Sequence, residues 1–83
     1  MMNRADIVGI IARHAREILP ELSDHQFEDS DRLADLGANS VDRAEIVMMV
    51  QESLSLSVPR VQLFGPKNIG ELADLLLKTL HAA

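Results

Sequence analysis

One serine stands out among the residues of this chain that could do chemistry. Ser40 follows a turn of small residues, Gly37 to Asn39, in the stretch LADLGANSVDRAEIV, and it precedes a helical pattern. Its surroundings do not read G-x-S-x-G, and no alternating strand supplies the nucleophile elbow of a serine hydrolase. Two uses of the hydroxyl remain open. It could cap the helix, as Asn39 could do equally well, or it could carry an attached group at the positive end of the helix.

The other reactive side chains do not form a catalytic or metal-binding pattern. The chain has no Cys, which excludes disulfides, thiolate metal sites and thiol nucleophiles. His14, His25 and His81 are far apart, with no spacing suited to a shared metal. The loop after residue 23 is acidic, but its order does not match an EF-hand. We therefore expect no catalytic residue, no metal site, packing or surface roles for the histidines, and a solvated acidic face made of Asp24, Glu28, Asp29, Asp31 and Asp35.

Length and charge narrow the class of protein. The 83 residues suit one domain, residues 1–83, with room for one core. Thirteen acidic against eight basic residues give a net charge of -5, which disfavours nucleic acid and anionic membranes as partners. The charged amino-terminal segment resembles neither a signal peptide nor a membrane span, so we expect a cytoplasmic setting. The expected partners are proteins with basic surfaces.

The periodicity of apolar residues predicts an all-α fold. One helix is expected over about residues 3–19, ended by Pro20, and a second from Ser40 to Leu54. A short helix should begin at Pro59 and stop before Gly65. The last helix should start at a cap, Asn68, with Glu71 reaching back to it. The expected architecture is a small four-helix bundle, three longer helices and one short one, with a long loop between the first two long helices.

Apolar residues scattered through the chain should hold this bundle together. The long loop approaches the upper limit for a compact domain, so its four apolar side chains are expected to fix it to the core. These are Leu22, Phe27, Leu33 and Leu36. The last helix should point a similar set inward, namely Ile69, Leu72, Ala73, Leu76 and Leu80.

The helix at residues 40–54 has apolar residues on two sides. Ile46, Val47, Val50 and Leu54 form the obvious core stripe. Val41, Ala44 and Met48 form a second strip, bordered by Asp42, Glu45 and Glu52. An exposed apolar strip with a charged rim is typical of a protein-docking surface. The alternative is that the long loop covers this strip. Arg43 projects toward the core side, where its stem can follow the core edge while the guanidinium stays in water.

Over essentially its whole length, the chain resembles the acyl carrier protein family. The resemblance rests on Leu33, Leu36, Gly37 and Ser40, followed by Glu45, Ile46 and Val47 in the family spacing, and on the VP pair before the short helix. It implies that a phosphopantetheinyl transferase attaches 4′-phosphopantetheine from coenzyme A to Ser40 and that acyl groups are carried as thioesters. It also implies that partners dock on Val41, Asp42, Ala44, Glu45 and Met48.

The chain departs from the family pattern around the serine. Asn39, Ser40 and Val41 replace the usual Asp-Ser-Leu, and the basic Arg43 follows. The form GANSVDRAEIV is similar to that of discrete carriers in polyketide pathways, including carriers that present a malonyl-derived acetyl unit for β-branching. The partners implied are an acyltransferase, a ketosynthase or an enzyme resembling hydroxymethylglutaryl-coenzyme A (HMG-CoA) synthase, and a carrier that visits several enzymes is expected to be a monomer.

Two other functions remain open from the sequence. The chain could be a housekeeping carrier of fatty-acid synthesis. It could instead be a non-catalytic helical adaptor in which Ser40 only caps its helix and the apolar strip binds a partner peptide or helix.

Overall fold

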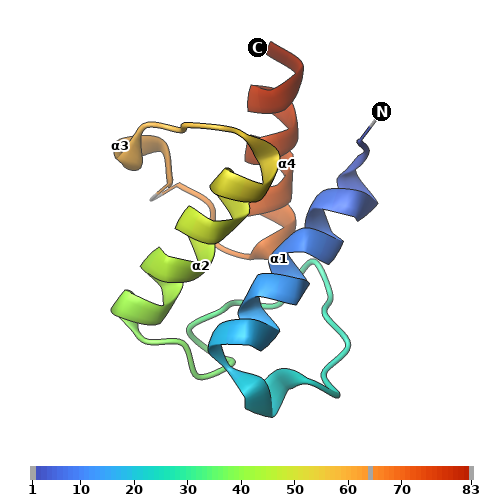
Figure 1. Cartoon of the computed structure of the whole chain (residues 1–83), viewed down its shortest axis with the longest axis vertical. Helices are drawn as coiled ribbons and strands as arrows, with labels where there is room; N and C mark the ends of the chain where they lie inside the picture. Colours follow the sequence, from blue (N-terminus) through green and yellow to red (C-terminus); the bar gives the residue numbers. More distant parts are fainter. Residues whose placement is uncertain (1, 64, 83) are drawn as a thin grey trace.

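The computed structural model describes residues 2–63 and 65–82, and within them every regular element is helical. The elements are α1 (Arg4–Ile18), a 3-10 turn η1 (Pro20–Leu22), α2 (Ser40–Leu54), α3 (Arg60–Leu63) and α4 (Ile69–Ala82). α1 packs against both α2 and α4, and in Figure 1 the short α3 lies at the edge of the molecule. The predicted all-α bundle of three longer helices and one short helix is confirmed.

Each of the three long helices begins at an asparagine. The amide oxygens of Asn3, Asn39 and Asn68 accept hydrogen bonds from backbone N–H groups three residues later, at 2.8–2.9 Å. In α1 and α2 an aspartate at that third position returns the bond to the backbone of the asparagine. In α4, Glu71 Oε1 instead accepts from the backbone of Lys67, 3.2 Å away. The predicted cap at Asn68 is therefore present, but the partner predicted for Glu71 was wrong.

One apolar core lies among α1, α2 and α4. Its largest fully buried side chains are Ile7, Ile11, Ile46, Val50, Ile69 and Leu76. The expected core stripe of α2 is largely confirmed, with Val47 only half-buried at its edge. Leu80 was expected in the core but is half-exposed, because α4 extends there beyond the elements packed against its first turns.

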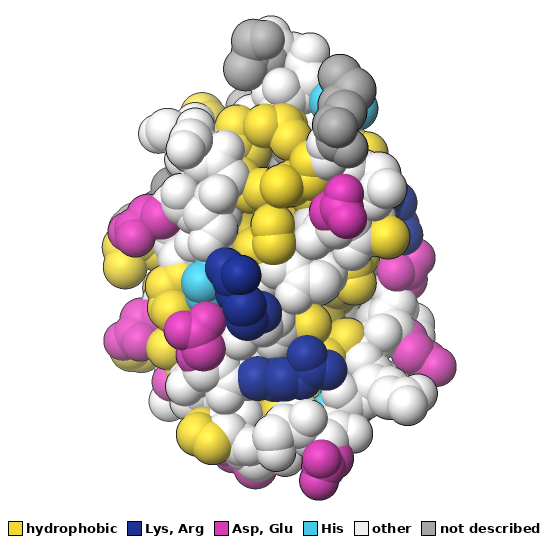
Figure 2. All heavy atoms as spheres, turned by 45° about the vertical axis from the view of Figure 1, so that its right-hand side comes forward, with side chains coloured by type: hydrophobic (Ala, Val, Ile, Leu, Met, Phe, Trp, Pro, Cys, Tyr) yellow, Lys and Arg dark blue, Asp and Glu magenta, His cyan; other side chains and the backbone are white. Residues whose placement is uncertain are grey.

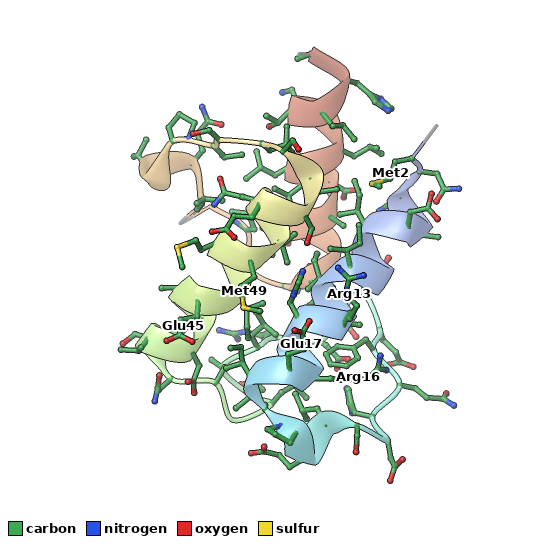
Figure 3. All side chains as sticks on the ribbon, in the orientation of Figure 1. Met2, Arg13, Arg16, Glu17, Glu45 and Met49 are labelled. Atoms are coloured by element: carbon green, nitrogen blue, oxygen red, sulfur yellow. The ribbon has the colours of Figure 1, made fainter. Side chains whose placement is uncertain are left out.

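The surface over α1 and α4 has an uneven distribution of side chains. Figure 2 shows hydrophobic side chains gathered in the upper half of this view, basic side chains near its centre and acidic ones scattered around its edge. In Figure 3, Arg13 and Arg16 lie on α1. Arg16 donates to the carbonyls of Leu22 and His25, and its guanidinium lies 4.9 Å from the ring centre of Phe27. The Arg16 side chain therefore stabilises the loop.

The long loop crosses the start of α4. The carbonyls of Asp29 and Asp31 accept from the backbone N–H groups of Gly70 and Ile69, both at 2.9 Å. The first N–H groups of a helix have no partner within the helix, so the loop supplies acceptors for two of them. As predicted, apolar side chains fix this loop, two of them buried and two half-buried: Leu22 and Leu33, and Phe27 and Leu36.

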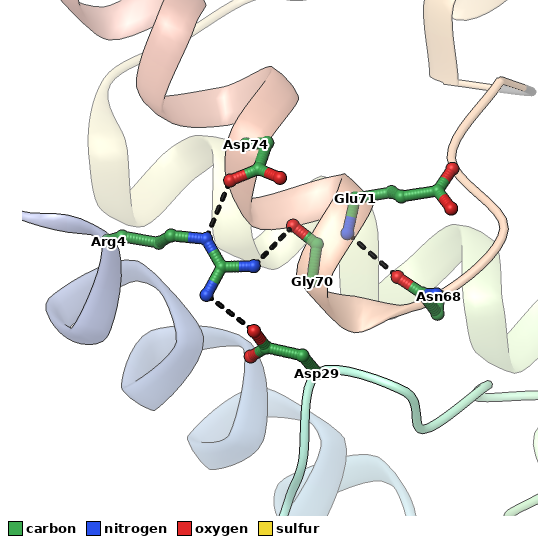
Figure 4. Close-up of polar contacts among 6 residues, drawn as sticks. All are labelled: Arg4, Asp29, Asn68, Gly70, Glu71 and Asp74. Atoms are coloured by element: carbon green, nitrogen blue, oxygen red, sulfur yellow. Dashed lines mark hydrogen bonds and ion pairs between the residues drawn. The ribbon is translucent and has the colours of Figure 1, made fainter.

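Arg4 stabilises the contact between the long loop and the start of α4 (Figure 4). Its Nε donates to Asp74 Oδ1 at 2.6 Å, its Nη1 lies 2.7 Å from Asp29 Oδ2, and its Nη2 donates to the Gly70 carbonyl at 3.2 Å. Hydrogen bonds to Asp74 and Asp29 raise the pKa of Arg4, so the guanidinium stays charged. One side chain thereby joins α1, the long loop and α4.

The acidic loop is more structured than a solvated acidic face. Asp31 is half-buried and accepts from the backbone N–H of Glu28 at 2.8 Å, and its carboxylate also lies 2.9 Å from His25 Nε2. These contacts, the Glu28 bond first, hold the pKa of Asp31 below its usual value. The prediction was therefore wrong for Asp31, whose carboxylate is half-buried and fixes the loop, whereas Asp29 is exposed as expected and pairs with Arg4 from the surface.

Replacing Gly70 by alanine should destabilise the protein, whereas the same change at Gly9 should not. A Cβ on Gly70 would lie 2.8 Å from Asp29 Cβ and 2.9 Å from Arg4 Nη2, whereas a Cβ on Gly9 would meet nothing within 4 Å. We expect Gly70→Ala to lower the free energy of unfolding by about 1–3 kcal/mol through overpacking. Gly9→Ala should raise it by roughly 0.5–1 kcal/mol through helix propensity. Urea unfolding of both variants checks this, and equal stabilisation by the two would contradict the close packing described here.

Candidate functional site

Ser40 is the first residue of α2, and it is exposed. The cap of this helix is Asn39, whose Oδ1 accepts from the Asp42 backbone at 2.8 Å while Asp42 Oδ2 accepts from the Asn39 backbone at 3.2 Å. The Ser40 hydroxyl makes no hydrogen bond with the part of the protein that the structure describes. The interpretation of Ser40 as a helix cap is therefore wrong, since its neighbour fills that role.

The turn before Ser40 explains how the serine reaches the surface. Gly37 has a φ of 104°, a conformation that glycine adopts without steric cost. The next residue, Ala38, is buried, and its N–H donates to the Leu33 carbonyl at 3.0 Å. The chain is thus anchored inside the core one residue before the cap, so Asn39 and Ser40 emerge at a fixed place.

The predicted apolar strip of α2 lies on the surface. Val41 is 63% and Met48 53% exposed, and Ala44 between them is exposed as well. The long loop does not cover this strip, because its backbone is bonded to the start of α4. Glu45 is exposed on α2, as Figure 3 also shows. Asp42 is only half-buried, but its carboxylate is occupied by the cap, so of the predicted docking set it has the least freedom to meet a partner.

A groove of about 1050 Å³ has Ser40 among its lining residues. It follows α2 past Val47 and is closed on its other side by Val58, by Leu63 of α3 and by Leu72 of α4. The strip residues Val41, Ala44 and Met48 line the same groove, so the exposed strip is one of its walls. The groove was not predicted from the sequence. The apolar residues of the VPRVQL segment were the available signal, but they do not reveal on which side of α2 the segment lies.

Arg43 lines the groove together with Ser40. It is half-buried, and its Nη1 donates to the Ala38 carbonyl at 2.8 Å. From the sequence, its stem was predicted to lie at the core edge and its guanidinium in water. The head group is instead held by a backbone carbonyl, because Ala38 is buried and its carbonyl has an acceptor site within reach of this side chain.

The histidines have separate structural surroundings. His14 is buried between α1 and α2, with Nε2 2.7 Å from Ser53 Oγ and Nδ1 2.9 Å from Glu17 Oε1, although the latter contact lacks hydrogen-bond geometry. His25 contacts Asp31, and its ring packs edge-on against Phe27. Among the residues described, no three His, Asp or Glu side chains are grouped so as to hold a metal ion. In this same part of the chain, no helix is long and apolar enough to cross a membrane.

These features suit a group that is attached covalently at this position. A free hydroxyl at a surface helix start is accessible to another enzyme, and a groove beside it provides space for a group attached there. No histidine contacts Ser40 in the described structure, so nothing there resembles the base of a Ser-His nucleophile pair. The exposed hydroxyl and the groove beside it thus fit an attached group.

The comparisons with known proteins agree with this site. Residues 9–76 match the family described as phosphopantetheine attachment site. The chain is 50% identical to the polyketide biosynthesis acyl-carrier-protein AcpK of Bacillus subtilis (strain 168) over 82 residues, which are 99% of this chain and 100% of that protein.

A solved structure is also similar. It is the crystal structure of the curacin biosynthetic pathway HMG synthase in complex with acetyl donor-ACP. One of its chains superposes with a TM-score of 0.85 at 55% identity, covering 90% of this chain and 96% of that one.

The chain therefore belongs to the acyl carrier protein family, whose members carry a phosphopantetheine group. Its cofactor is 4′-phosphopantetheine, bound covalently. Bound in this way, the group supplies a terminal thiol on which acyl groups are held as thioesters.

Proposed function

We propose that this protein is an acyl carrier of a polyketide pathway, that residues 1–83 form one carrier domain, and that 4′-phosphopantetheine is attached to Ser40. The observation that carries the assignment of Ser40 is its exposed, unbonded hydroxyl beside a cap already supplied by Asn39. Ser40 occupies the serine position of the family motif, and among the described residues its hydroxyl has no structural contact that would account for a serine there.

Attachment requires one reaction at Ser40 Oγ, catalysed by a phosphopantetheinyl transferase. The hydroxyl attacks the phosphorus of coenzyme A that carries the pantetheine. An Oγ–P bond forms, the P–O bond to the 3′-phosphoadenosine phosphate breaks, and the serine proton passes to a base of the transferase. The carrier itself supplies no general acid or base to this reaction or to later acyl chemistry. Its contribution is to hold the substrate at high local concentration beside enzymes that dock on it.

Docking is assigned to the α2 surface formed by Val41, Asp42, Ala44, Glu45 and Met48. Val41 and Met48 are exposed apolar anchors, and Glu45 supplies a negative charge for a basic partner surface. Beside the transferase, the partners proposed are an acyltransferase, a ketosynthase or an HMG-CoA-synthase-like enzyme.

Among these partners, the HMG-CoA-synthase-like enzyme is favoured. The solved relative with 55% identity is from a complex of an HMG synthase with an acetyl donor carrier. We therefore propose that the cargo is an acetyl unit donated in β-branching. A housekeeping role in fatty-acid synthesis is less well supported, because one relative is named for polyketide biosynthesis and the other for the curacin biosynthetic pathway.

An acetyl-transfer assay tests this function. The modified protein is loaded with an acetyl thioester and incubated with the HMG synthase of the curacin pathway, and intact mass follows the loss of the acetyl group and its gain by the synthase. We expect transfer to this enzyme and not to a fatty-acid ketosynthase. The synthase's own donor carrier is the positive control. Transfer from that control but not from this protein would contradict the acetyl-donor role and leave the carrier assignment intact.

A further inference from the structure

Arg43 is a half-buried cation that lines the groove, and a single hydrogen bond to the Ala38 carbonyl uses only part of its donor capacity. Arg4 and Arg32 have carboxylate partners, whereas Arg43 makes no ion pair with any described carboxylate. One of its N–H groups is used by the Ala38 carbonyl, and a guanidinium has five. A half-buried positive charge with spare donors is costly unless an anion or water uses them.

The position of Arg43 relative to Ser40 suggests which anion that is. The two residues are three apart in the first turn of α2, so their side chains lie on neighbouring positions of one helix face. Both line the same groove. The bond to Ala38 draws the guanidinium back toward the chain that leads into Ser40, away from the later turns of the helix.

Resting on the attachment of phosphopantetheine to Ser40, we propose that Arg43 is a positioning residue that binds the phosphate of that group. The phosphate is joined directly to Ser40 Oγ and carries one negative charge as a diester. A guanidinium binds phosphate oxygens through paired, charge-assisted N–H bonds, and Arg43 is already oriented by the Ala38 carbonyl. Fixing the phosphate fixes the base of the arm at the mouth of the groove and restricts the directions in which its thiol end can be presented.

The guanidinium signals of the native protein test this proposal directly. The arginine Nε–Hε resonances are compared by NMR before and after modification by the transferase. We expect the Arg43 signal to shift, while the Arg32 signal stays in place, since Arg32 lines the same groove but has an exposed side chain near Asp35. An unchanged Arg43 signal in a protein that has gained the full mass of the arm would overturn the proposal.

Thermal unfolding gives an independent readout. Tm is measured with and without the arm for the native protein, Arg43→Gln and the matched control Arg32→Gln. We expect modification to raise Tm by about 4 °C more in the native protein and in Arg32→Gln than in Arg43→Gln, because only the last lacks the phosphate contact. Equal increases in all three proteins would also overturn the role of Arg43. Absence of any mass gain in the native protein would instead contradict the attachment on which the inference rests.

Discussion

Ser40→Ala should abolish modification while leaving the protein folded. After incubation with coenzyme A and a broad-specificity phosphopantetheinyl transferase, intact mass should show one added 4′-phosphopantetheine on the native chain and none on the variant. The free energy of unfolding should change by less than about 0.5 kcal/mol, because Ser40 is exposed and alanine is a good helix former at that position. All carrier activity should be lost without any loss of structure.

Two further substitutions make this result specific. Ser57→Ala, at another exposed groove-lining serine, should be modified like the native protein. Asn39→Ala should lower the free energy of unfolding by about 1 kcal/mol, since it removes the cap of α2. If Ser40→Ala still gained the arm, Ser40 would not be the attachment site. If neither the native protein nor Ser40→Ala gained the arm under a transferase active on another carrier, attachment of phosphopantetheine to this protein would be contradicted.

Glu45→Lys should slow association with partner enzymes. Glu45 is exposed beside the apolar strip, so reversing its charge replaces attraction to a basic partner surface with repulsion. We expect the association rate constant with the transferase to fall roughly tenfold at low ionic strength and the difference to disappear at high salt. Stopped-flow binding at several salt concentrations measures both effects.

The matched control for this reversal is Asp24→Lys. Asp24 is exposed in the long loop, outside the α2 surface, and its substitution changes the net charge by the same amount. An association rate that falls equally in both variants would assign the effect to overall charge and remove Glu45 from the docking surface. Loss of rate in Glu45→Lys alone would locate the surface on α2.

Local sequence signals were sufficient for much of this structure. The bounds of α2 and the end of α1 before Pro20 were predicted because apolar periodicity and proline act within a few residues. The exposed strip of Val41, Ala44 and Met48 followed from the same periodicity, since one helix in a small bundle cannot bury two opposite faces. The position of Ser40 at the start of α2 was also evident, although only the structure shows that Asn39 is the cap.

Features that depend on distant segments were not predictable in this way. The loop path depends on bonds from residues 29 and 31 to the start of α4, and no local pattern encodes a pairing across about forty residues. The groove depends on where the segment before α4 lies relative to α2. The head group of Arg43 is placed by the buried carbonyl of Ala38, which the helical pattern alone does not reveal.

The crossing of the loop over α4 also affects local unfolding of the molecule. Helix ends usually fray, because their first N–H groups are free to exchange with solvent. Here the Ile69 and Gly70 amides are held by carbonyls from the other half of the chain, and Arg4 joins both to α1. The start of α4 can therefore open only if these hydrogen bonds and the Arg4 contacts break, so its amides should exchange with solvent more slowly than those of an ordinary helix start.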